Sequence, residues 1–330
     1  MNSVQRINRA LKIVQGFILE ADIGVLHLAR HPRSSMRAMA RARDVHPEIL
    51  RRRLMAIGRR REEICAQLSL CFRDIGRVWI LDPTYTKDRE ERLLVIAVLE
   101  EFSGKAVPVW WSYQSWEEMR QNPPLSRNLM VEGEVRKLKK TLGHSFVILA
   151  DREFGSKRFR TRLKKMGMGY VLRLRRNDAP GFGDERETLY RGRGFEDSWR
   201  LVSRKQGGDP VKLYRKRMRI EALFRDLKSL FGMRSLLRRV SNEEVKEGLV
   251  VLMMLAWLFV FLRTLLSLLK GLISQDSLHF RSHTRGEISI ITLGLTLLER
   301  WITRLRSPCA TGLSGDVLQD YKREVFRCVR

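Results

Sequence analysis

Short apolar runs alternate with helical segments in the middle of the chain. Helical patterns at 127–142 and 156–166 separate several of these runs. Some runs are too continuously apolar to be half-exposed, which is typical of strands covered on both faces of a sheet. The runs are VWIL (78–81), LLVIAVL (93–99), AVPVWW (106–111), FVILA (146–150) and YVLRL (170–174). The pattern predicts a mixed α/β domain.

Helical, basic sequence flanks this domain on both sides. The stretch SSMRAMARARDVHPEILRRRLMAIG (34–58) predicts a helix, a break near Asp44 to Pro47 and a second helix, as in a helix-turn-helix. We expect a helical basic DNA-binding region at 1–76, the α/β domain at 77–262 and a helical C-terminal region at 263–330. A polar, Gly-rich insertion at about 176–210 holds one strand-like piece near 198–203.

A second amphipathic segment, YRKRMRIEALFRDLKSLF, runs from 214 to 231. As one helix of about 100° per residue, it places Tyr214, Arg217, Glu221 and Lys228 in a stripe about 60° wide. The opposite face is apolar and predicted to be buried, with Ile220, Leu223, Leu227 and Leu230. An alternative is a solvated face on which Glu221 forms i,i+4 ion pairs with Arg217 and Arg225.

The most apolar segment is predicted to be a helix from about 244 to 270. Its uninterrupted run, 248–262, has 15 residues before Arg263, whereas a bilayer span needs about 20. We therefore expect a buried core helix and no membrane partner, with a membrane helix as the alternative. The first 24 residues are interrupted by charges and make a poor signal peptide. A cytoplasmic location is expected.

The charge of the chain favours a polyanionic partner. The 330 residues carry a formal net charge of +27, with a pI near 10.8. Double-stranded DNA is therefore a better candidate than a membrane surface, although a high pI can also serve solubility. Between Arg30 and Arg61 there are 11 arginines and 2 acidic residues. We expect Arg51 and Arg52, in the second helix of this stretch, to contact DNA.

Cysteine spacing gives no sign of a zinc site or a disulfide framework. The four cysteines show no C-x-x-C spacing and no paired histidines. They are Cys65, Cys71, Cys309 and Cys328. This usage fits a reducing cytoplasm.

Three carboxylates are candidates for chemistry. Asp82 and Asp151 each follow an apolar strand, at the sheet edge where α/β folds commonly place active sites. Either one alone could be an ordinary strand-end or helix-cap residue. Together with Glu221 they can hold two Mg²⁺ ions, for which Mn²⁺ can substitute, about 3.5–4 Å apart at a phosphodiester. Tyr214, Arg217 and Lys228 would then hold the DNA backbone on either side.

These residues resemble a known family. Asp82-Pro-Thr84, Asp151-Arg152-Glu-Phe154 and the spacing Y-x2-R-x3-E-x6-K from Tyr214 to Lys228 look like the DDE transposases of bacterial insertion sequences that carry the YREK signature. The resemblance covers roughly 78–262. It implies a ribonuclease H-like fold, in which helices flank a mixed sheet, and a catalytic, metal-binding triad of Asp82, Asp151 and Glu221. Arg152 joins the expected DNA contacts.

The reaction implied by the resemblance is metal-dependent nicking at the terminal inverted repeats, followed by attack of the new 3′-hydroxyl on target DNA. A homodimer on DNA is expected because two ends must be brought together. Two other interpretations stay open, a catalytically inactive DNA-binding descendant and a metal-dependent nuclease without strand transfer.

The chain departs from the family pattern at two places. Glu153 stands where relatives often have Gly, and it either points away from the metals or alters their occupancy. Only 69 residues separate Asp151 from Glu221, so any insertion is small. Trp199 lies in the region where some relatives carry a base-stacking tryptophan. Packing is the favoured interpretation of Trp199.

Overall fold

The computed structural model describes residues 2–272, apart from 22–35, 43, 76, 86–90, 102, 116–120, 122–123, 193–197 and 206. Beyond 272 it describes residues 291, 294 and 295. The predicted C-terminal helical region, with Cys309 and Cys328, therefore lies almost entirely outside the described residues. The division of the chain at 77 and 262 stays a prediction.

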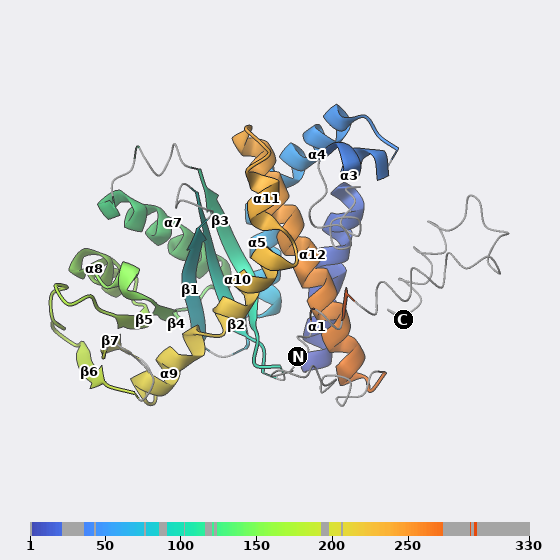
Figure 1. The fold of residues 1–330 in the computed structure, drawn as a ribbon. Coiled ribbons are helices and arrows are strands. Elements are labelled where there is room, and N and C mark those ends of the chain that lie inside the picture. Colours follow the sequence, from blue (N-terminus) through green and yellow to red (C-terminus); the bar gives the residue numbers. More distant parts are fainter. Residues whose placement is uncertain are drawn as a thin grey trace.

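A seven-stranded mixed sheet forms the centre of the molecule (Figure 1). Its order is β3-β2-β1-β4-β5-β7-β6, with β1, β4 and β5 parallel and the other pairs antiparallel. The strands are β1 (Val78–Tyr85), β2 (Arg92–Leu99), β3 (Ala106–Gln114), β4 (Val147–Ala150), β5 (Gly169–Arg173), β6 (Arg186–Tyr190) and β7 (Trp199–Arg204). The α/β class is confirmed, and helices flank the sheet in a manner consistent with a ribonuclease H-like fold.

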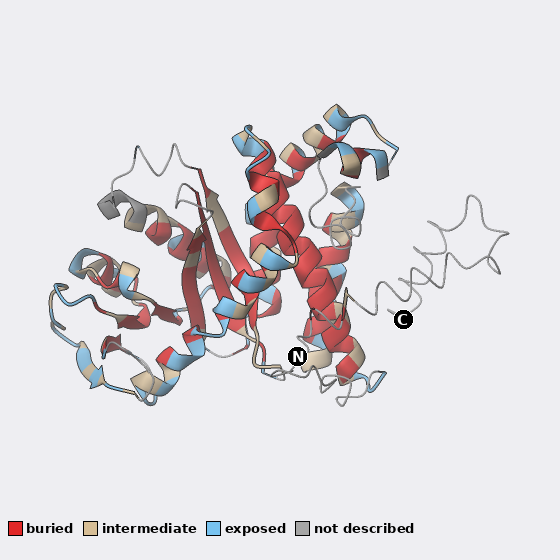
Figure 2. Ribbon diagram, in the orientation of Figure 1, coloured by how far each residue is buried: buried red, intermediate tan, exposed pale blue. Residues whose placement is uncertain are grey.

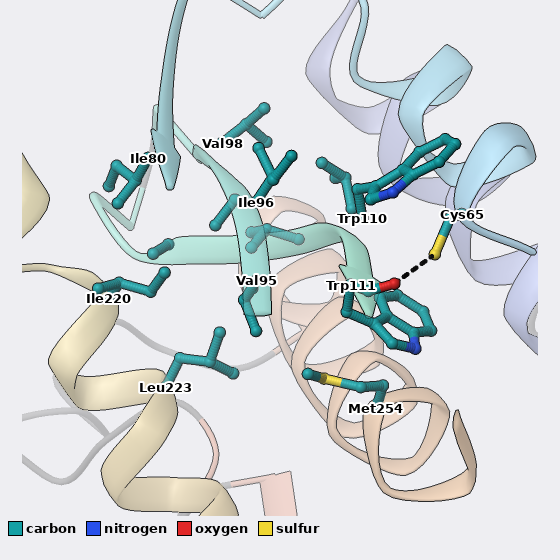
Figure 3. Packing of buried hydrophobic residues seen from close by; sticks show 14 of the residues in the cluster. Cys65, Ile80, Val95, Ile96, Val98, Trp110, Trp111, Ile220, Leu223 and Met254 are labelled. Atoms are coloured by element: carbon teal, nitrogen blue, oxygen red, sulfur yellow. Dashed lines mark hydrogen bonds between the residues drawn. The ribbon is translucent and has the colours of Figure 1, made fainter. Parts of the chain in front are cut away.

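Helices cover both faces of the sheet. On one side lie α7 (Pro124–Leu142) and α8 (Lys157–Lys165), and on the other α10 (Ile220–Ser229) and α12 (Glu243–Leu269) (Figure 1). The indole of Trp110 on β3 donates to Glu134 Oε2 of α7 at 2.6 Å. Its neighbour Trp111 points the other way, toward Met254 of α12 (Figure 3), as successive residues of a strand must.

The apolar face predicted for the 214–231 segment is buried. Ile220 and Leu223 lie over the sheet beside Val95 of β2 (Figure 3). Ile220, Leu223 and Leu227 are at most 2% exposed, and Leu230 is partly buried against the same core. The face with a period of 3.6 residues thus docks the helix that carries Glu221.

The free edge of β3 is covered by α5 (Arg61–Cys71). Ser69 Oγ donates to the carbonyl oxygen of Val109 at 3.1 Å, and the Arg61 guanidinium donates to that of Trp111. These side chains satisfy backbone acceptors that an edge strand would otherwise expose. The N-terminal helices are thereby attached to the sheet.

The helix-break-helix predicted at 34–58 is present as α3 (Met36–Ala42) and α4 (Pro47–Arg59). The His46 side chain caps α4 by accepting from the Glu48 N–H at 3.3 Å. Both α4 and α1 (Ser3–Ala21) pack along α12. The backbones of α4 and α12 come into contact where Gly58 faces Gly248.

The long apolar helix α12 is buried along nearly its whole length (Figure 2). By length and composition it is able to cross a membrane, yet 94% of its most apolar 18-residue window is buried inside the protein. Apolar residues all round a helix are typical of a buried core helix. The prediction of a core helix is confirmed.

The short polar segment after β5 contains one strand more than predicted. β7 corresponds to the strand-like piece at 198–203, and β6 pairs with it at the sheet edge. β6 was missed because its sequence, RETLY, is mostly polar and exposed. The segment is held to α8 by an ion pair between Arg160 and Glu185, whose side chains are fully buried.

Two described cysteines are expected to be unreactive in the folded protein. Burial raises the pKa of the Cys65 thiol to about 12 and that of Cys71 to about 11, and the thiolate is the reactive form. In a Cys309→Ser/Cys328→Ser background, a thiol reagent at about pH 8 should label neither residue until guanidinium unfolds the chain. Rapid labelling of the native variant would contradict this burial.

Candidate active site

Two of the predicted carboxylates are brought together by the register of the parallel strands. Leu81 of β1 pairs with Ala150 of β4. Asp82 follows Leu81 within β1, and Asp151 follows Ala150 just after the end of β4, so both stand just beyond the last β1–β4 pair. Parallel strands end at the same sheet edge, which explains why two distant sequence positions converge.

Asp82 lies inside β1 and not at its end, as the apolar pattern had suggested. β1 continues to Tyr85 through antiparallel pairs with β2, including Asp82 with Val95. On its other side, the pairing of β1 with β4 ends at Leu81. Pro83 has no backbone N–H, and no hydrogen bond to β4 is required of it at this position. The prediction ended the strand at Leu81 because a carboxylate and a proline followed.

The helix predicted from 214 to 231 is interrupted, and this corrects the single-stripe geometry. α9 (Pro210–Arg217) ends and α10 begins at Ile220, with Met218 and Arg219 forming a turn between them. The N–H groups of Met218, Arg219 and Glu221 each bond to the carbonyl three residues earlier. The tighter turn changes the relative orientation of Tyr214 and Arg217 on one side and Glu221 on the other.

Arg217 links the helical segment to the first aspartate. Its Nη1 donates to Asp82 Oδ2 at 2.7 Å, and its Nη2 lies 3.8 Å from Glu221 Oε1. The Arg217 and Asp82 side chains are about nine-tenths buried, whereas that of Glu221 is 50% exposed. The i,i+4 pair considered as an alternative for Glu221 is thus present as a long contact, but it lies at the carboxylate site.

The second aspartate is held by Tyr214. The phenolic O–H donates to Asp151 Oδ1 at 2.8 Å, and Tyr214 is only 1% exposed. The ring of Trp199 packs edge-on against Tyr214, with centroids 5.1 Å apart, and against Tyr190 at 5.5 Å. Trp199 is 3% exposed. Packing, the favoured role for Trp199, is what the structure shows.

The two aspartates of the site have pKa values shifted in opposite directions. The pKa of Asp82 is raised to about 7. Burial is the largest cause, Arg217 opposes it, and the charges of Asp151, Glu153 and Glu221 add to the rise. Burial also acts to raise the pKa of Asp151. There Arg217 outweighs burial, together with the backbone N–H of Arg152, the Tyr214 hydroxyl and Arg173, so this pKa falls below its ordinary value.

Glu153, the departure from the family pattern, is anchored by Tyr85 and Arg92. Both of its carboxylate oxygens accept from the Tyr85 hydroxyl, at 2.7 and 2.8 Å, and Arg92 Nη1 donates to it at 2.9 Å. Arg92 is fully buried and also donates to Gln114. Both oxygens of Glu153 thus already have partners, which favours the interpretation that it is not a metal ligand.

The remaining predicted DNA contacts lie at different places. Lys228 is half-buried on α10, where burial first and then Arg234 lower its pKa while Asp82 opposes the change. Arg152 is exposed in the short 3₁₀ helix η2 (Arg152–Phe154) that follows Asp151. Arg51 and Arg52 on α4 have 41% and 77% of their side chains exposed, each beside Glu48. Contact of all these residues with DNA stays a prediction.

The donor set suits a hard cation. Asp82, Asp151 and Glu221 offer carboxylate oxygens, the ligands that Mg²⁺ and Mn²⁺ prefer. Their mutual repulsion is offset in this structure by Arg217, whose Nε is buried with no hydrogen-bond partner. Across the part of the chain that the structure describes, no three Asp, Glu, His or Cys side chains are arranged to hold one metal ion.

Some residues of the site escaped the sequence reasoning. Arg173, at the end of β5, contributes to the low pKa of Asp151. Arg92 opens a strand that is otherwise entirely apolar, RLLVIAVL, and this buried charge was the available signal. Neither position has a spacing that ties it to the carboxylates before the sheet is built.

Comparison with known proteins adds independent support. A search of curated proteins found no match. Residues 132–259 match the family model described as the transposase DDE domain. The matched region includes Asp151, Glu221 and the turn between α9 and α10. Asp82 lies outside the matched region, and the β1–β4 register places it beside Asp151. The site and the matched region together support a DDE transposase.

Proposed function

We propose that this protein is a metal-dependent DNA transposase that nicks the ends of an insertion sequence and joins the freed 3′-hydroxyl to target DNA. The observation that carries the proposal is the gathering of Asp82 and Glu221 around Arg217, beside Asp151 in the matched domain. The spacing from Tyr214 to Lys228 supports the bacterial group with the YREK signature.

Each residue of the site has a distinct task under this proposal. Asp82, Asp151 and Glu221 would hold two Mg²⁺ ions, or Mn²⁺ in their place. Bound ions of this kind supply Lewis-acid activation of a hydroxyl and stabilise the leaving oxygen. Tyr214 orients Asp151 through its hydrogen bond, and Arg217 keeps Asp82 and Glu221 close together while no ion is present.

The partner is double-stranded DNA, both the terminal inverted repeats and the target. The net charge of +27 supports this assignment because phosphate contacts by Lys and Arg supply most of the affinity for DNA. Arg51, Arg52, Arg152 and Lys228 are the proposed contacts. Tyr214 and Arg217, also expected to contact DNA, are buried against Asp151 and Asp82, and we assign them to positioning the carboxylates. We further propose a homodimer on DNA, since two ends are joined in one reaction, and a bacterial cytoplasmic location at the nucleoid.

The test is a cleavage and joining assay with a labelled duplex carrying the repeats that flank the gene at its own locus. With Mg²⁺ or Mn²⁺ we expect nicking at the repeat boundary, and joining of a pre-nicked 3′-hydroxyl end to a second duplex. Nicking without joining would reduce the proposal to a nuclease. Binding without either reaction would contradict the proposed catalysis.

A further inference from the structure

A cationic pocket lies between α7 and α8, outside the carboxylate site. It has a volume of about 660 Å³, and five cationic side chains and one carboxylate line it together with Thr161. The charged lining residues are Glu132, Arg136, Lys157, Arg158, Arg162 and Lys165. We refer to it as the α7–α8 pocket. A net charge of four from these side chains, gathered in one concave site, favours an anionic ligand.

The carboxylate of the pocket serves to position two of its arginines. Glu132 has only 7% of its side chain exposed, and it pairs with Arg136 at 2.7 Å through one oxygen and with Arg162 through the other. A guanidinium held in this way loses less conformational freedom when it binds an anion. The two helices are also joined at the Ser156 hydroxyl, which accepts from Asn128 at 3.4 Å. The pocket is therefore preorganised.

The other cations of the pocket are exposed. Lys157, Arg158 and Lys165 form no ion pair with the carboxylates that the structure describes. Arg158, Arg162 and Lys165 follow the i, i+4, i+7 spacing of one helix face. With about 1.5 Å rise per residue, α8 spans about 12 Å from Lys157 to Lys165. At 3.4 Å per nucleotide, this length matches three to four phosphates of one DNA strand.

The pocket is connected to the carboxylate site by a short stretch of chain. Asp151 is followed by η2, and Ser156 caps α8 by accepting from the Phe159 N–H at 3.3 Å. The basic face of α8 thus starts six residues after a proposed catalytic carboxylate. We propose that the α7–α8 pocket binds the sugar-phosphate backbone of DNA that extends beyond the carboxylate site. This inference rests on the proposed function and adds a contact surface to it.

The test compares two double charge reversals. Arg158→Glu/Lys165→Glu alters the pocket, while Arg77→Glu/Lys205→Glu alters exposed cations at the opposite end of the strands, before β1 and after β7. Both variants change the net charge by the same amount. Binding of a duplex of about 30 base pairs is followed by fluorescence anisotropy over a series of NaCl concentrations. Circular dichroism and melting temperature check that each variant folds.

The pocket variant should bind at least about tenfold more weakly than wild type, and its log–log salt slope should fall by about two, because two phosphate contacts are lost. The control variant should keep most of the wild-type slope. Equal losses of DNA affinity in both variants would contradict the role proposed for the pocket while leaving the proposed function intact. If the reversal prevents folding, Arg158→Gln/Lys165→Gln and the control Arg77→Gln/Lys205→Gln give the same comparison with matched charge.

The pocket and the proposed function fail in distinguishable ways. A wild-type protein that binds DNA through the pocket but neither nicks nor joins it would retain the inference and contradict the transposase. A wild-type protein that does not bind the duplex at low salt would overturn both.

Discussion

Replacing any one of the three carboxylates by its amide should lower metal-dependent DNA cleavage at least about a thousandfold. The variants are Asp82→Asn, Asp151→Asn and Glu221→Gln. Each keeps the size of the side chain but removes the charge that would bind the ion. Affinity for the uncleaved duplex should stay within about threefold, because phosphate contacts by Lys and Arg supply most of it. Nicking rates and anisotropy measured on the same duplex check both statements.

Glu153→Gln is the matched control for these amides. Glu153 belongs to the same acidic neighbourhood, since its charge helps to raise the pKa of Asp82. Its oxygens, however, are occupied by Tyr85 and Arg92, so this variant should keep cleavage within about tenfold of wild type. Activity of Glu221→Gln at the wild-type rate would show that Glu221 is not part of the triad.

The Asp82→Asn variant should also be more stable than wild type at high pH. The pKa of Asp82 is raised to about 7 in the folded protein, so its charged form is disfavoured there. This cost grows as pH rises from the unfolded pKa toward the folded one and is complete above about 7. The gain in melting temperature should thus be larger near pH 8 than near pH 4.5. With such a result, lost cleavage could not be ascribed to unfolding.

Gly248→Ala should destabilise the protein by about 2–4 kcal/mol. A Cβ at Gly248 would lie 2.0 Å from the backbone oxygen of Leu54, and a backbone atom cannot turn aside as a side chain can. The helices α4 and α12 would have to separate along a buried crossing. Urea denaturation followed by circular dichroism measures the change in the free energy of unfolding.

Gly133→Ala is the matched control for this prediction. Gly133 is also inside a helix, α7, but a Cβ there would meet no atom within 4 Å. Alanine is the better helix former, so this variant should gain about 0.5–1 kcal/mol. A loss of similar size in both variants would mean that the helix crossing is not the cause. Because α4 carries Arg51 and Arg52, Gly248→Ala should also weaken DNA binding.

The sequence by itself determined which segments become strands and helices in the core. Short, continuous apolar runs are typical of strands covered on both faces, and a longer run is typical of a buried helix. Five strands and the helix α12 were therefore predictable. The apolar face of α10 followed from its 3.6-residue period. Local signals failed where burial was absent, as in the exposed strand β6, and where a polar residue stood inside a strand, as at Asp82.

The candidate site was predictable in its residue types but not in its contacts. Asp82, Asp151 and Glu221 were proposed from position and spacing, and their role in catalysis stays a prediction. Only the parallel register of β1 and β4 put Asp82 beside Asp151, and only the docking of α9 on β1 and β4 set Arg217 against Asp82. Contacts between residues 63 to 135 positions apart depend on how strands pair and helices dock. No local pattern encodes that arrangement, which is why the roles of Tyr214, Arg217 and Glu153 emerged from the tertiary structure.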